Sequence, residues 1–395
     1  MKKTYQIQLM TNNESNEYLR CLWSRIRFHF GKLAWNLYPH KIGKTKTIFF
    51  GDADMGKVTN KFDSVSFSCN YSKKGCLKTL TYECSNLKDP HQFEEMLDTC
   101  INESFSYRNY LKIHLLEFKL GTEILFNPFN GKNFSLKDNI LRFKICGYDK
   151  ADISTFSQNI VRTIKNLLSF DTLRFIHSKG SGIEQICNID AIKCSFTSSN
   201  NGDLISEINT NDRYKNLSIS KYIADYVDIL LDRNIDYECL YTKFEESISI
   251  FSQGLFFEEM NNSKFYLDTT FSEYAVLCYM SALEVISCND ITSSKCDKCG
   301  QDVYSISKRV TTLVKNATNN DFFKNTVSDF YKARSKFVHT GKLLSMHNYI
   351  GESIPLLSIN SKYGIVTQHS HLGFNIKELI KECIIWHKNN VILEK

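Results

Sequence analysis

The apolar residues of this 395-residue chain change their spacing once, and that change constrains the fold more than any other feature. Before about residue 210, apolar segments are short, rich in β-branched and aromatic residues, and partly alternate with polar positions. From Leu217 onward, apolar residues recur at three- and four-residue intervals over much longer segments. Alternation predicts strands, and the longer period predicts helices. We therefore predict an α+β chain: a mixed or β-rich domain over residues 1–210, followed by an all-α domain over residues 211–395.

Most elements of the first half are predicted to be strands. A helix is expected among them at 155–168, where apolar residues recur every fourth position. Residues 51–56, with the sequence Gly-Asp-Ala-Asp-Met-Gly, are predicted to form a turn between two strands. The predicted strands are 4–10, 46–50, 64–71, 77–84, 113–120, 140–147 and 192–198, and the predicted helices of the second half are 219–231, 240–260, 271–286, 304–314, 322–338 and 376–386.

Charge and cysteine content limit the cellular setting. The formal net charge of +6 is compatible with an anionic partner but does not require one. The chain has 14 cysteines scattered along its length, and a polar run follows its first ten residues. No segment resembles a signal peptide or approaches the roughly 20 apolar residues that cross a bilayer. We expect a cytoplasmic protein without a membrane partner, in which most cysteines are reduced and buried.

A basic and aromatic segment lies near the amino terminus. Its cationic residues could hold a phosphate backbone while its aromatic residues stack on bases. The same pattern also fits an ordinary element with one core face and one solvated face, and this interpretation is preferred. The segment contains Arg20, Arg25, Arg27, His29 and Lys32, interleaved with Trp23, Phe28, Phe30 and Trp35.

Residues 329–341, with the sequence DFYKARSKFVHTG, carry the most informative pattern. Their periodicity predicts an amphipathic helix, and Arg334 falls inside its apolar stripe, where a charge must be paired or lie at an interface. Gly341 is placed to end the helix, so His339 lies in its last turn, where a protonated imidazole is favoured. The stripe comprises Val327, Phe330, Tyr331, Phe337 and Val338.

Arg334 and His339 are about 140° apart around an ideal helix. One regular helix therefore cannot direct both side chains at a single point. They can converge near a frayed helix end, or when two copies of the chain meet around a two-fold axis.

The sequence YKARSKFVHTG at 331–341 resembles the R-x4–6-H signature of HEPN domains, and more narrowly the Y-x-x-R-S-x-x-V-H-G pattern of the Apea-like branch. Two upstream segments add to the resemblance, Ala282-Leu283-Glu284 and the arginine-bearing segment 306–310. The resemblance spans roughly residues 240–395. It departs from the family pattern at Thr340, where glycine is common, and in the insertion Cys-Asp-Lys-Cys-Gly at 296–300.

The resemblance implies a helical-bundle HEPN endoribonuclease that acts as a homodimer, needs no metal or cofactor for catalysis, and serves as an antiviral, abortive-infection or toxin effector. Its partner would be RNA, with tRNA among the candidates. In this interpretation His339 transfers protons, Arg334 stabilises the phosphate, Ser335 holds a phosphate oxygen, and Glu284 orients either Arg334 or Arg309. The residues expected to contact RNA are Arg309, Tyr331 and Lys336.

Two alternatives stay open. A HEPN domain without activity could dimerise and bind RNA or protein. Alternatively, Cys296 and Cys299 form one CxxC that could hold a structural zinc ion in a nucleic-acid-binding regulator. Zinc needs four ligands, which Cys288 and His347 or a second chain would have to complete. Otherwise the two cysteines are unligated thiols.

Overall fold

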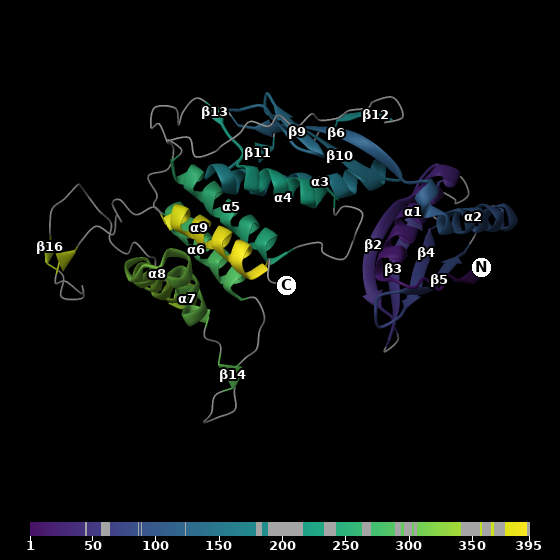
Figure 1. Ribbon diagram of the computed structural model, residues 1–395. Coiled ribbons are helices and arrows are strands. Elements are labelled where there is room, and N and C mark those ends of the chain that lie inside the picture. Colours follow the sequence, from purple (N-terminus) through teal and green to yellow (C-terminus); the bar gives the residue numbers. More distant parts are fainter. Residues whose placement is uncertain are drawn as a thin grey trace.

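The structure is a computed structural model in which both helices and antiparallel sheets are present, as the mixed α+β prediction required, with most helices in the later part (Figure 1). Among the described helices, none combines the length and apolar character that a membrane span requires. The described residues are 1–43, 46–56, 64–85, 87, 89–122, 124–178, 184–188, 216–232, 242–262, 270–288, 294–295, 302–303, 306–340, 356–357, 365–366 and 376–392.

The first unit is a five-stranded antiparallel sheet with two helices that pack on each other. Its strand order is β1-β5-β4-β3-β2. Buried side chains of both helices and the sheet form one apolar cluster, which runs from Ile7 to Ile101. The elements are β1 (Lys2–Gln6), α1 (Asn12–Phe30), β2 (Ala34–Lys41), β3 (Thr47–Asp54), β4 (Val65–Tyr71), β5 (Leu77–Cys84) and α2 (Pro90–Phe105).

Local signals explain the bounds of α1. Thr11 accepts a hydrogen bond from the Glu14 backbone while the Glu14 side chain accepts one from the Thr11 backbone, a capping box that starts the helix. Gly31 ends it in the left-handed conformation at φ 78°.

The predicted turn at 51–56 is wrong over its first four residues, which belong to β3. Gly51 has φ 134° at a bulge between β2 and β3, and a Cβ there would lie 2.2 Å from the Asn36 carbonyl oxygen. This glycine lets two strands approach closely instead of reversing the chain.

The second sheet has the strand order β11-β6-β10-β9-β8, and β12 also pairs with β6. Helix α3 lies against this sheet, and α4 lies beside α3 (Figure 1). The elements are a 3-10 turn (Tyr107–Asn109), β6 (Lys112–Gly121), β7 (Leu125–Phe126), β8 (Phe129–Asn130), β9 (Phe134–Lys137), β10 (Ile140–Gly147), α3 (Lys150–Thr172), β11 (His177–Ser178), β12 (Glu184–Asn188), β13 (Asn216–Leu217) and α4 (Lys221–Asp232).

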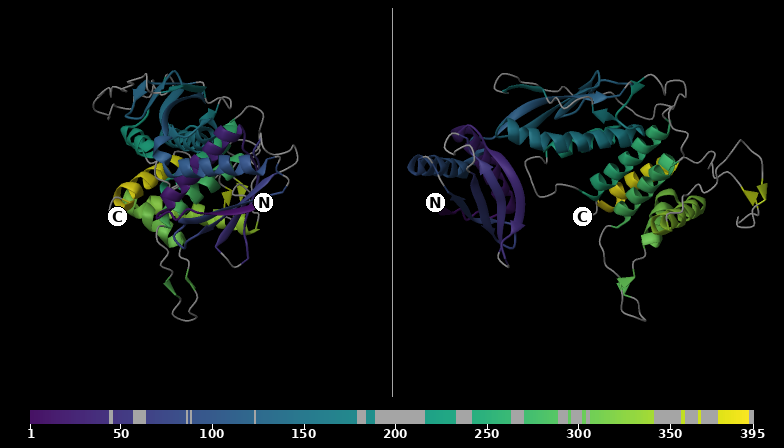
Figure 2. Two further views of the ribbon diagram at one scale, coloured as in Figure 1. Left: turned by 90° about the vertical axis from the view of Figure 1, so that its right-hand side faces the viewer. Right: turned by 180° about the vertical axis from the view of Figure 1, so that it is seen from behind.

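The remaining helices pack on the opposite side of α3 from the sheet (Figure 2). Helices α5 and α6 form the most extensive helix pair, α9 packs on α6 and α7, and α8 packs on α7 and α6. The elements are α5 (Lys243–Asn262), α6 (Thr270–Ser287), β14 (Ser294–Lys295), β15 (Asp302–Val303), α7 (Ile306–Thr318), α8 (Asp321–Thr340), β16 (Leu356–Leu357), β17 (Ile365–Val366), α9 (Ile376–His387) and a π-helical turn (Lys388–Ile392).

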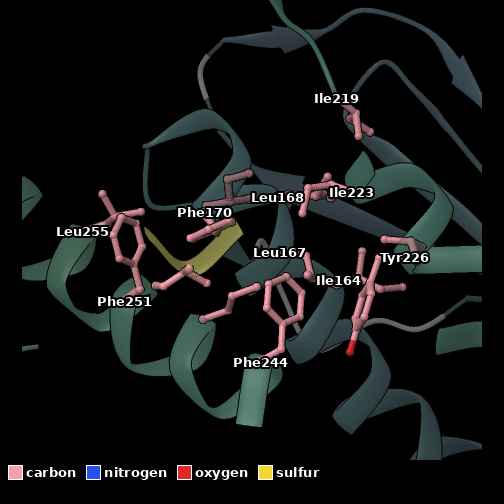
Figure 3. Close-up of a cluster of buried hydrophobic side chains, with 14 of the residues drawn as sticks. Ile164, Leu167, Leu168, Phe170, Ile219, Ile223, Tyr226, Phe244, Phe251 and Leu255 are labelled. Atoms are coloured by element: carbon pink, nitrogen blue, oxygen red, sulfur yellow. The ribbon is translucent and has the colours of Figure 1, made fainter. Parts of the chain in front are cut away.

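The second sheet shares its core with these helices. Side chains of α3, α4 and α5 meet in one cluster that includes Ile164, Ile223 and Phe251 (Figure 3). This cluster extends from Leu116 to Ile384 and is separate from that of the first unit. The described core thus divides between Ile101 and Leu116, whereas the boundary predicted near residue 210 lies in 189–215, outside the described residues.

Nine cysteines have side chains that the structure describes, and all nine are free and six are buried, as expected for small apolar core residues. Burial raises the pKa of several of these thiols, that of Cys100 to about 12, so they are not activated nucleophiles.

Candidate functional site

Helix α8 carries the Arg334 motif and is positioned by its apolar stripe. Val327 is fully buried, and Phe330 and Tyr331 pack half-buried against the helical core. Helix α8 also contacts α6, and Arg334 points toward Glu284 of that helix. The predicted helix is confirmed, and its apolar stripe is buried over Val327, Phe330 and Tyr331, whereas Val338, which was predicted to belong to the stripe, is exposed.

Glu284 on α6 is the partner of Arg334. The Arg334 Nη2 donates to Glu284 Oε2 at 2.9 Å, and the two side chains are 22% and 15% exposed. Ala282 and Leu283 before it are fully buried, which fixes the place of Glu284 at the edge of the core. Of the two arginines that Glu284 was expected to orient, the structure brings it to Arg334.

Tyr331 lies one helical turn before Arg334 and faces the same carboxylate. Its ring centroid is 6.0 Å from the Arg334 Cζ. Burial, hydrogen bonding to Glu284 and the charge of Glu284 together raise the pKa of Tyr331 to about 12. The hydroxyl therefore stays protonated near neutral pH and can donate to Glu284.

The Arg334–Glu284 pair leaves two polar atoms without partners among the described residues. Arg334 Nε and Glu284 Oε1 are both buried and unbonded. A buried unsatisfied group costs free energy, about 1–3 kcal/mol, that a bound ligand or water would recover. The pair can therefore make two further hydrogen bonds, one donated by Arg334 Nε and one accepted by Glu284 Oε1.

The structure describes the side chains of only some of the other predicted site residues. Ser335 is half-buried, next to Arg334 on α8, and Arg309 is half-buried on α7. His339 lies in the last turn of α8, as predicted. The side chains of His339 and Lys336 lie outside the described part of the structure, as does Gly341.

Cys296 and Cys299 also lie outside the described residues, between β14 and β15, which pair antiparallel. No group of three or more histidine, cysteine or acidic side chains that could hold a metal occurs where the chain is described. The zinc hypothesis therefore stays a prediction.

The basic and aromatic segment near the amino terminus forms helix α1, with one face in the core of the first unit. The core face of the preferred interpretation is confirmed, but the expected solvated face is not, because within α1 only Asn12 and Phe28 are exposed. The cations of the segment pair with acids. Arg25 pairs with Glu103, and Lys32 with Asp54. Arg20 and Arg27 instead pair with acids of α3 and its N-cap, more than 120 residues away along the chain. No sequence spacing could have predicted those long-range pairs.

No protein-family model matches this chain, and neither the curated proteins nor the solved structures searched gave a match.

Proposed function

We propose that the carboxyl-terminal helices form a HEPN-type bundle with metal-independent endoribonuclease activity, centred on Arg334 and His339. The observation that carries the proposal is the placement of Arg334. It is held by Glu284 in an otherwise apolar stripe, five residues before the histidine in the last turn of α8. Helices α6, α7 and α8, which hold the three segments that resemble the family, pack on one another, which supports the proposal further.

The residues suit attack of the 2′-hydroxyl oxygen of RNA on the adjacent phosphorus, in which the new bond from phosphorus to the 2′-oxygen replaces the bond to the leaving 5′-oxygen. His339 takes the hydroxyl proton, and an acid, the histidine of the same or a second copy, protonates the leaving 5′-oxygen. Arg334 stabilises the extra negative charge on the phosphorane with its planar, permanently charged guanidinium. Ser335, adjacent to Arg334, supplies a hydroxyl for a phosphate oxygen. The products end in a 2′,3′-cyclic phosphate and a 5′-hydroxyl.

A homodimer completes the proposed site. Arg334 and His339 are about 140° apart on an ideal helix, so in this proposal a second copy supplies the complementary group. Val338, four residues after Arg334 and hence on the same face, is 54% exposed. An exposed apolar side chain beside the motif is the kind of residue that a two-fold contact would cover.

The Arg334–Glu284 pair is also compatible with a second candidate function, binding without catalysis. In a HEPN domain without activity, the same ion pair would simply join α6 to α8, and the dimer would bind RNA or a partner protein. The two candidates differ in whether Arg334 and His339 are needed for cleavage. The wider role, a cytoplasmic antiviral or toxin effector, belongs to this proposal and rests on the family resemblance alone.

Cleavage of RNA by the purified protein tests the proposal. We expect the wild type to cut in EDTA and to leave cyclic phosphate ends, and Arg334→Ala and His339→Ala to lose at least about 100-fold in rate, as for loss of a positioned acid–base group. Lys332→Ala is the matched control, because Lys332 is an exposed cation of the same helix that pairs only with Asp329 in the described structure.

Two results would contradict the proposed endoribonuclease mechanism. One is cleavage by folded His339→Ala at the wild-type rate, and the other is loss of cleavage on chelation while the fold persists. Binding of RNA without any cleavage would favour the inactive binding module. Light scattering that finds an active monomer would exclude the two-fold site.

A further inference from the structure

The contact between the units of the two core clusters includes two arginine–aspartate forks. Helix α1 of the first unit meets the amino-terminal end of α3 in the second (Figure 1). Two arginines of α1 cross this junction, Arg20 and Arg27. The chain itself connects the units through the short segment 106–111, which includes a 3-10 turn.

Arg20 is the centre of the junction and is 8% exposed. Its Nε and Nη2 donate to the two carboxylate oxygens of Asp152, each at 2.8 Å. Its Nη1 donates to Glu17 at 2.7 Å, and Glu17 also accepts from the Tyr148 hydroxyl at 2.6 Å. The guanidinium lies 4.0 Å from the ring centroid of Phe156. A bidentate, desolvated pair of this kind fixes the orientation of both partners.

Arg27 adds a second fork two turns further along α1. It donates to both oxygens of Asp149, at 2.6 and 3.0 Å. Asp149 is also the N-cap of α3 and accepts from the Asp152 backbone. Burial acts to raise the pKa of Asp149, but its bonds with Arg27 and Asp152 outweigh burial and lower it. Asp149 therefore stays charged at neutral pH.

The interactions at this junction differ from those in the core of either unit. Each unit has its own apolar core, whereas the junction depends on charged forks. Buried ion pairs specify orientation while adding little net stability, because desolvation offsets most of their attraction. Such a junction can therefore separate while each apolar cluster stays packed, in the manner of a polar interface between domains, although opening uncovers the Phe156 ring beneath Arg20.

We propose that Arg20 and Arg27 form an electrostatic clamp that docks the first unit, residues 1–105, on the start of α3 in one orientation, and that opens without unfolding either unit. The clamp is a conformational device, since opening frees the first unit to reorient about segment 106–111. Helix α3 carries both acids of the clamp near its start, while its later residues pack in the helical core against α5 (Figure 3). The clamp does not depend on the proposed ribonuclease activity.

Small-angle X-ray scattering of the full chain, combined with limited proteolysis, tests the clamp. Arg20→Ala/Arg27→Ala should increase the radius of gyration and expose a new cleavage site within 106–111. Arg27→Glu should do the same through repulsion of Asp149, and it disturbs the fold less because Arg27 is partly exposed. The matched control is Lys32→Ala, which removes an ion pair with Asp54 that lies within the first unit.

The fold of the first unit is followed separately by near-ultraviolet circular dichroism. Trp23 and Trp35 contact each other edge to face at 4.9 Å between ring centroids and report its packing. An open shape with this signal retained supports the clamp. Unchanged scattering and proteolysis in both clamp variants would overturn it. Loss of the tryptophan signal in Arg27→Glu would also overturn it, because the contact would then be part of the fold of the first unit.

Discussion

Removing the Glu284 carboxylate should destabilise the protein more than removing the whole Arg334–Glu284 pair. A hydrogen bond to a charged group contributes about 1.5–3 kcal/mol, and a charge left alone in a fully buried site costs about 3–5 kcal/mol. Arg334 keeps 22% of its side chain exposed, so part of its charge can still reach water. We therefore expect Glu284→Ala to lower the free energy of unfolding by about 2 kcal/mol. In a unit of this size, that is roughly a 4–8 °C fall in Tm.

The double variant Glu284→Leu/Arg334→Met provides the comparison. It replaces both charges with apolar side chains of similar volume, a change that is nearly neutral for many buried pairs. Thermal and urea unfolding should therefore place it closer to the wild type than to Glu284→Ala, although it should not cut RNA. A double variant as unstable as Glu284→Ala, or a Glu284→Ala protein with wild-type Tm, would refute this account of the pair.

Three further predictions concern separate groups. Tyr331→Phe removes the hydroxyl that faces Glu284 and should lower the free energy of unfolding by about 1 kcal/mol in urea titrations. It should also weaken RNA binding if the hydroxyl contacts RNA, as the family resemblance implies, and wild-type RNA affinity would contradict that contact. Burial lowers the pKa of His387 below its value in the unfolded state. The unfolded state therefore gains the proton first, and the free energy of unfolding falls as the pH drops below about 6.5. His387→Leu should remove this part of the pH dependence, and a free energy of unfolding that changes equally with pH in the variant and the wild type would contradict the role of His387. If Cys296 and Cys299 bind zinc, the Cys296→Ser/Cys299→Ser variant should melt earlier yet still cut RNA while folded, and elemental analysis that finds no zinc would exclude the site.

The long helices of the second half were predictable because each buries a stripe that the 3.6-residue period makes visible. Strands β5 and β10 were predicted with the observed bounds for the analogous reason of alternation. Helix α2 was missed, although Asp89 at its N-cap and Pro90 in its first turn are recognised start signals. Helix α1 stayed undecided because core and surface residues are closely interleaved along it.

The candidate site was predictable only in part. Spacing placed Arg334 in the apolar stripe of its helix and His339 in the last turn. It could not choose between Arg334 and Arg309 as the partner of Glu284, because that choice depends on how α6 packs against α7 and α8. The pairing of Arg20 with Asp152 was beyond any sequence pattern, since 132 residues separate them. Only tertiary packing brings those side chains together.

The 3′ ends of RNA in cells that express the protein test the ribonuclease proposal most directly. Total RNA from cells with the wild type should accumulate fragments with 2′,3′-cyclic phosphate ends at a limited set of sites. Cells with His339→Ala at an equal protein level should lack these fragments. The same cyclic ends at equal abundance in both cultures would contradict the assignment of His339, and with it the proposed mechanism.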